Sequence, residues 1–348
     1  MSTLRAPLHL LRSVSGPRRS PGRVGEGLLS TGLPNPDRRR RHWMNPTLPN
    51  TIPAAYVALG ATSGFNPKAV ERLNWLLASE GGLGKTTFAS SIPHSLLIDL
   101  ENGSHSVVHM NSVRVPVARN YEKFEKVMSQ LVQDSKLVQR NPAHLPFQTV
   151  IIDSVDVLAD TMAAQICAEK SDPGKNRVYN YIGEYGSGGA GWALLRNRVT
   201  RVFSILEEYG YAWVAICHKT ERLVETADGR RAPIVQPTLF GSCYDDLQQR
   251  ADLEANIVVL RTTEHKTEDV TLPDGRIIKK PAGTVTTISH VLKITPDESR
   301  WAKRRLDLGT IPDIAIPRDN GWNTFATIYS QRVAEIKKTL EVPNGGRN

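Results

Sequence analysis

The chain has 348 residues, is 40% hydrophobic and 23% charged, and carries a formal net charge of +9. This length is enough for one or two folded domains, and the composition is that of an ordinary globular protein. No apolar run approaches the roughly 18 residues that a membrane helix needs, so we expect no membrane partner. The three cysteines are far apart in the sequence and form no C-x-x-C pair, which favours a reducing compartment, the cytoplasm.

The positive charge is concentrated in the first residues of the chain. Residues 1–43 contain nine arginines and only two acids, Glu26 and Asp37, so the remaining sequence is nearly neutral. Residues 1–50 are rich in Arg, Ser, Pro and Gly, and we expect them to form a disordered basic tail. Three interpretations remain open: a transit peptide, a basic arm that binds nucleic acid, or a start assigned upstream of Met44.

A leader with several prolines, residues 51–72, precedes a strand, a glycine-rich turn and a helix. The apolar run Leu73–Ala78 predicts the strand, and Thr86–Ala89 can begin the helix. Between them, Ser79–Thr87 fits the phosphate-loop pattern G-x-x-x-x-G-K-[ST], except that Ser79 stands at the first glycine position. Backbone N–H groups of such a loop surround an anion at the positive end of the helix. The alternative is an ordinary glycine-rich turn before a helix.

The phosphate-loop interpretation assigns a role to each residue of the turn. Lys85 would reach the β- and γ-phosphates of a nucleotide, and Thr86 would hold Mg²⁺. The residues predicted to bind the nucleotide are Gly81, Gly82, Leu83, Gly84, Lys85, Thr86 and Thr87.

Short apolar runs then alternate with helical patterns as far as residue 261. Such alternation indicates an α/β fold with a mainly parallel sheet between two layers of helices. The predicted strands are residues 95–100, 149–153, 212–217 and 257–260, and the predicted helices are 121–139, 155–170 and 193–209. We therefore expect residues 73–261 to form the core domain.

Polar side chains end three of these strands, where ligands of parallel sheets bind. Asp153 follows Val150-Ile151-Ile152 and is expected to organise Mg²⁺; the alternative is a helix cap. Glu101 follows strand 95–100 and could accept a proton from a water that attacks the γ-phosphate. Asp99 is its close competitor, although strand alternation would point it away from the nucleotide. His218 could contact the γ-phosphate, or could be a histidine that is satisfied locally.

Two polar segments are candidates for contacts with nucleic acid. The long stretch after His218 contains the basic residues Lys219, Arg222, Arg230 and Arg231 and shows no clear buried element. Such segments are usually functional or mobile, and basic residues with an occasional aromatic suit single-stranded nucleic acid. The alternative for this segment is a solvated insertion. Residues 171–192 carry three tyrosines on which bases could stack, and ordinary packing of these rings is the alternative there.

The C-terminal part of the chain reads as a β-rich extension and a final helix. Residues 262–310 contain the hairpin signal Pro273-Asp274-Gly275 between short apolar runs, and residues 311–348 contain a helix and a tail. Lys303 and Arg304 form part of a basic cluster that could reach the nucleotide of a neighbouring subunit, although a plain surface cluster is the simpler interpretation.

These residues together resemble RecA-like ATPases. Ser95–Glu101 is similar to the RecA strand that ends in the catalytic glutamate, and Val150–Ser154 is similar to its Walker B strand. His218 stands at the position of the RecA γ-phosphate sensor, and the segment after it stands at that of the second DNA-binding loop. The closer resemblance, over residues 73–335, is to the phage-encoded branch that includes the Sak-type single-strand annealing ATPases. It rests on Lys303-Arg304-Arg305, Leu308–Pro312 and Trp322–Phe325.

The resemblance implies a RecA-like P-loop ATPase with a β-hairpin appendage. ATP and Mg²⁺ would be its cofactors, with Lys85, Glu101 and His218 in catalytic roles and Thr86 and Asp153 at the metal. Single-stranded DNA, further copies of the chain and a single-strand-binding protein would be its partners, in the bacterial cytoplasm if the chain is phage-encoded. The alternative is a nucleotide-dependent assembly or loader protein without direct DNA contact.

Overall fold

The computed structural model describes residues 67–104, 111–225, 231–273, 276–294, 303–304, 313–317 and 320–341. These residues belong to one compact unit, Pro67–Asn348. The predicted basic tail lies outside the described residues, as does the leader up to residue 66. Among the described residues, no helix combines the length and apolar character needed to cross a lipid bilayer.

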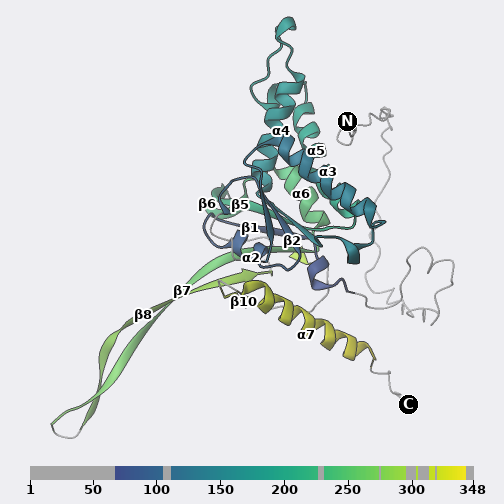
Figure 1. Cartoon of the computed structure of the whole chain (residues 1–348). Helices are drawn as coiled ribbons and strands as arrows, with labels where there is room; N and C mark the ends of the chain where they lie inside the picture. The colour runs from purple at the N-terminus through teal and green to yellow at the C-terminus, as the bar shows by residue number, and fades with distance from the viewer. Residues whose placement is uncertain are drawn as a thin grey trace, which may run out of the picture. The chain divides into compact units, whose positions relative to one another are not determined.

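The described chain alternates strands and helices (Figure 1). The strands are β1 (Trp75–Ser79), β2 (Ser95–Asp99), β3 (Val113–Pro116), β4 (Thr149–Asp153), β5 (Ala212–Glu225), β6 (Arg231–Pro237), β7 (Leu253–Thr271), β8 (Ile277–Lys293), β9 (Lys303–Arg304) and β10 (Ile314–Ala315). The α-helices are α2 (Lys85–Ser90), α3 (Tyr121–Leu137), α4 (Val155–Lys170), α5 (Ala190–Glu208), α6 (Gly241–Arg250) and α7 (Gly321–Glu341). Short 3₁₀ turns are η1 (Val70–Arg72), η3 (Pro142–His144), η4 (Pro173–Lys175) and η5 (Ile182–Glu184).

One ten-stranded sheet organises the fold, in the order β10-β8-β7-β1-β5-β4-β2-β3, with β6 paired to β5 and β9 to β7. The six strands from β7 to β3 run parallel to one another. Every residue of β1, β2 and β4 is buried, as expected for strands that are covered on both faces. In Figure 1, α3 to α6 group on one side of this sheet, while α2 and α7 lie on the other. The predicted α/β class and mainly parallel sheet are confirmed.

The segment after His218 differs from the prediction of a long loop. β5 continues to Glu225 and pairs antiparallel with β6, with Lys219 opposite Pro237 and Glu225 opposite Arg231. The sequence carries the corresponding signals, because Leu223-Val224 and Ile234-Val235 flank the turn residues Asp228-Gly229. Basic residues interrupt these apolar pairs and conceal the hairpin pattern.

The predicted hairpin around residues 273–275 is present and longer than expected. β7 and β8 pair antiparallel, from Asn256 opposite Lys293 to Thr271 opposite Ile277. The two strands project as an arm from the core (Figure 1). The domain boundary predicted after residue 261 falls inside β7, whose first residues pair with β1 in the core. Core and arm therefore share one continuous strand. The predicted C-terminal helix corresponds to α7.

An aromatic cluster packs α7 against β1 and α2. The ring centroid of Trp75 lies 4.6 Å from that of Phe325 and 5.8 Å from that of Phe88, and Trp322 lies 6.1 Å from both Trp75 and Phe88. All four side chains are buried. Because α2 begins at the phosphate loop, this cluster ties the C-terminal helix to the loop.

We predict that Phe325→Ala lowers the free energy of unfolding by about 3–5 kcal/mol, because it leaves a cavity in this cluster. Urea denaturation followed by circular dichroism measures the change. Gln331→Ala, at an exposed position of the same helix, is the control and should change stability by less than about 0.5 kcal/mol. A Phe325→Ala variant as stable as this control would contradict the account of the cluster.

Candidate active site

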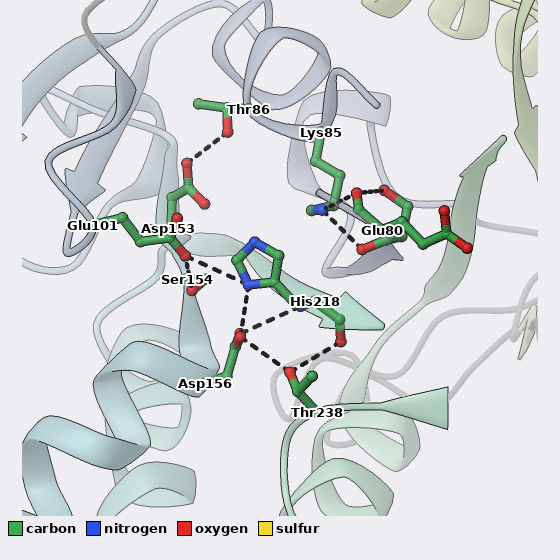
Figure 2. Close-up of polar contacts among 10 residues, drawn as sticks. Glu80, Lys85, Thr86, Glu101, Asp153, Ser154, Asp156, His218 and Thr238 are labelled. Atoms are coloured by element: carbon green, nitrogen blue, oxygen red, sulfur yellow. Dashed lines mark hydrogen bonds and ion pairs between the residues drawn. The ribbon is translucent and has the colours of Figure 1, made fainter. Parts of the chain in front are cut away.

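The predicted site residues meet at the carboxyl ends of the central parallel strands (Figure 2). Lys85, Thr86, Glu101, Asp153 and His218 line a single cavity of about 440 Å³. The loop residues Gly82, Leu83, Gly84 and Thr87 line it as well. Side chains from four separate parts of the sequence are thus brought together by the register of four strands.

The glycine-rich turn has the conformation that its glycines allow. Gly82 and Gly84 have φ angles of +77° and +91°, in the left-handed region that other residues rarely occupy. Ser79, the departure from the motif, is the last residue of β1 and pairs in register with His218. A residue in an extended strand does not require glycine, so serine fits this position.

The ammonium group of Lys85 lies against the loop. Its Nζ donates hydrogen bonds to the carbonyl oxygens of Ser79 and Glu80, both at 2.8 Å, and the residue is only 5% exposed. Burial lowers the pKa of Lys85, against the opposing charges of Asp153, Asp156 and Glu101. The loop thus holds a buried positive charge at its centre, where an anionic ligand would meet it.

Thr86 and Asp153 form the candidate metal position. Thr86 Oγ1 donates to Asp153 Oδ2 at 2.7 Å, and Asp153 is 6% exposed. Burial raises the pKa of Asp153 to about 6, assisted by the nearby carboxylates of Glu101 and Asp99. Among the described residues, no three His, Cys, Asp or Glu side chains cluster as a metal site. The hydroxyl and carboxylate oxygens fit Mg²⁺, which typically takes few protein ligands and completes its coordination with phosphates and water.

A polar network surrounds Glu101. Ser154 Oγ donates a hydrogen bond to Glu101 Oε1, and His218 Nδ1 lies 3.5 Å from the same oxygen. The Glu101 side chain is one-third exposed and faces the cavity. Asp99 is fully buried and points elsewhere, toward Ser104 and Arg114, as strand alternation predicted. Of Glu101 and Asp99, Glu101 is therefore the carboxylate that is available to a ligand in this cavity.

His218 is held by a second carboxylate, which the sequence did not single out. Asp156 Oδ2 lies 2.7 Å from His218 Nδ1 and accepts a hydrogen bond from Thr238 Oγ1 at 3.1 Å. The hydrogen bond with Asp156 raises the pKa of His218, although burial opposes it. Burial alone would raise the pKa of Asp156, but its bonds with His218 outweigh this effect and the pKa is lowered. The pair favours a positively charged imidazole beside the cavity.

Several site residues lie outside the predicted set. Ser154 and Asp156 come directly after the Walker-B-like strand, at the start of α4. Because they are within three residues of Asp153, the sequence could have predicted that they lie near the site. His290, Ile316, Pro317 and Gly321 line the same cavity from β8 and from the segment that leads into α7. Their positions depend on long-range strand pairing, for which the local sequence carries no signal.

The residues predicted to contact nucleic acid or a neighbouring subunit lie in different parts of the fold. Lys219 is 5% exposed and its Nζ donates a hydrogen bond to Asn256 Oδ1, so its ammonium faces the interior and not a surface groove. Arg222 and Arg231 lie on the β5–β6 hairpin, and Arg230 lies outside the described residues. Lys303 and Arg304 form β9, which pairs with Glu254 and Leu253 at the amino end of β7. That end of the sheet is opposite to the phosphate loop of the same chain.

We predict that Asp153→Asn stabilises the ligand-free protein by about 3 kcal/mol near pH 7. The folded protein keeps a proton on Asp153 up to about pH 6, so this group's contribution to stability is present below its unfolded pKa and lost as the pH rises through 6. Asparagine removes the buried charge, and the difference from wild type should vanish near pH 4.

Urea unfolding of both proteins at the two pH values measures this difference. Asp245→Asn, an exposed carboxylate on α6, is the matched control and should show no such pH dependence. If wild type and Asp153→Asn differ in free energy of unfolding by the same amount at both pH values, burial does not raise the pKa of Asp153.

No curated protein matches the chain. A KaiC-like protein from the hyperthermophilic archaeon Pyrococcus horikoshii matches with 12% identity and a TM-score of 0.30, over 71% of this chain and 87% of that one. The AAA domain family matches residues 71–306, a range that contains the phosphate loop, Glu101, Asp153 and His218. Since this match covers more than half of the sequence, the chain belongs to the AAA domain family of P-loop NTPases.

Proposed function

We propose that the protein binds ATP with Mg²⁺ and hydrolyses it. The observation that supports this proposal is the convergence of Lys85, Thr86, Asp153 and Glu101 in one cavity. A phosphate-binding loop alone predicts nucleotide binding. A carboxylate that is exposed to the same cavity, and distinct from the candidate metal ligand, supplies a group for hydrolysis.

Each residue has a role that follows from its position. Lys85 and the N–H groups of the loop hold the phosphates, and Thr86 and Asp153 hold Mg²⁺. The metal, when bound, neutralises charge that develops on the phosphate oxygens. Glu101, which lines the cavity, accepts a proton from the attacking water, and Ser154 donates a hydrogen bond that fixes its Oε1. His218, oriented by Asp156, donates its remaining N–H toward the γ-phosphate.

ATPase assays on two variants test this assignment. Glu101→Gln should lower kcat by about 100-fold or more, with a small change in the Kd of ATP, because the amide cannot accept the proton. Lys85→Ala should abolish measurable ATP binding, because it removes the cation that faces the phosphates. Glu122→Gln, on the exposed surface of α3, is the control and should behave as wild type. Lys85→Ala with wild-type activity would refute the site.

We further propose that the protein acts on single-stranded DNA in phage-type recombination, annealing or replication. The β5–β6 hairpin supports this proposal, because it carries Arg222 and Arg231 and begins directly after His218. A second cavity of about 480 Å³ adds support: it is lined by the rings of Tyr181, Trp192 and Phe240 and by Asp156 and Thr238. Bases stack on such rings, and Asp156 and Thr238 contact His218, which would couple DNA to the nucleotide.

Assembly into a homo-oligomer in the cytoplasm, with a single-strand-binding protein as a further partner, belongs to the same proposal. Lys303 and Arg304 belong to β9, which pairs with the amino end of β7, opposite to their own phosphate loop, and this position supports a role at the nucleotide of a neighbouring copy. The alternative function is a nucleotide-dependent assembly or loader protein without direct DNA contact.

Binding of a single-stranded oligonucleotide in the presence of ATP, measured across salt concentrations, separates the two functions. We expect affinity to fall steeply with salt, because phosphate contacts release counterions. The double variant Arg222→Ala/Arg231→Ala should reduce both the affinity and the salt slope, with Lys337→Ala/Lys338→Ala on α7 as the charge-matched control. Absence of binding at low salt would favour the loader function.

A further inference from the structure

The nucleotide cavity has two chemically different sides, on either side of β1. In the sheet order, β5, β4 and β2 lie on one side of β1 and bring His218, Asp153 and Glu101 to the cavity. β7, β8 and β10 lie on the other side, and the cavity residues from this direction are His290, Ile316, Pro317 and Gly321. Charged groups are thus gathered on the first side, and apolar groups dominate the second.

The direction of a bound nucleotide follows from this asymmetry. Lys85 and Thr86 begin α2, and Thr86 contacts Asp153 on the charged side. The terminal phosphate therefore points toward Glu101, Asp153 and His218. The nucleoside leaves the loop toward the opposite side, where Phe88 of α2 completes the wall.

The wall on that side is tightly built. The N–H group of Ile316 donates to the carbonyl oxygen of His290 at 2.8 Å, and β10 pairs with β8 just before it. A Cβ atom at Gly321 would lie 3.1 Å from Phe88 and 3.3 Å from Ile316. These contacts connect β8, the 313–317 segment and α7 to the phosphate-loop helix, so the wall is positioned by the fold before a ligand arrives.

We propose that this wall, formed by His290, Ile316 and Pro317, binds the base of the nucleotide. This inference rests on the proposed binding of ATP at the phosphate loop and adds the part of the ligand that the loop does not contact. On a mainly apolar surface the favourable free energy of binding grows with the apolar area that is buried. A purine buries more area than a pyrimidine and should therefore bind more tightly. His290 is the polar side chain among the described wall residues, and it offers a ring for stacking and one nitrogen for a hydrogen bond.

Calorimetric titration with Mg·ATP and with magnesium tripolyphosphate tests the inference, because tripolyphosphate carries the phosphates without a nucleoside. Wild type should bind ATP at least about tenfold more tightly than tripolyphosphate, and ATP more tightly than CTP. The double variant His290→Ala/Pro317→Ala should raise the Kd of ATP by at least about fivefold. It should leave the Kd of tripolyphosphate within about twofold of wild type.

The matched control is His265→Ala/Pro281→Ala, which makes the same two substitutions at exposed positions on the β7–β8 arm, outside the cavity. Retained tripolyphosphate binding shows that the variant site is folded. If the double variant does not fold, His290→Ala alone should still change the ratio of the two Kd values in the same direction.

The outcomes separate this inference from the function on which it rests. If Lys85→Ala abolishes binding of both ligands but the wall variant leaves the ratio of their Kd values unchanged, the base binds elsewhere and the inference is wrong. If Lys85→Ala leaves ATP binding intact, the phosphate-loop site itself is wrong. Equal weakening of ATP and tripolyphosphate by the wall variant would also overturn the inference, because the wall would then act on the phosphates.

Discussion

The parallel register of four strands is the constraint on which the site depends. β1 pairs with β5, β5 with β4, and β4 with β2, so that Ser79, Asp153 and Asp99, which end their strands, lie at the same edge of the sheet as His218 of β5. The phosphate loop follows directly from this edge. A shift of one residue in any of these pairings would turn a site side chain to the opposite face of the sheet. The buried apolar strands that fix the register are therefore as important to the chemistry as the polar residues themselves.

Charge balance is the second property of the site. Glu101, Asp153 and Asp156 gather around a cavity in which Lys85 and His218 are the facing cations. Each carboxylate has a different partner: Ser154 for Glu101, Thr86 for Asp153, and His218 for Asp156. Because their partners differ, the three carboxylates can have different roles. The one that is most buried and has only a neutral hydroxyl partner, Asp153, has the raised pKa and is suited to a divalent cation.

The sequence predicted the parts of the molecule that depend on local pattern. The phosphate loop, the strand that ends at Asp153, the strand that precedes Glu101, and the final helix all follow from short motifs or from apolar periodicity. It did not predict the β5–β6 hairpin, because charged residues break the alternation, or the inward orientation of Lys219, because a lone lysine is normally exposed. The wall at His290 and Pro317 could not be predicted, because it arises from the pairing of β8 with β10 across a long separation in the chain.

The position of α7 on α2 sets an order for the synthesis of the site. Ribosomes make the phosphate loop at residues 79–87 more than two hundred residues before Gly321 and Trp322, which close the other side of the cavity and pack on Phe88. A nascent chain that has only reached β7 already contains the loop, Glu101, Asp153 and His218, but lacks the apolar wall and the aromatic helix that holds it. The cavity is therefore completed only once α7 has been translated, and a bound nucleotide would contribute its full binding energy to folding only after that helix has left the ribosome.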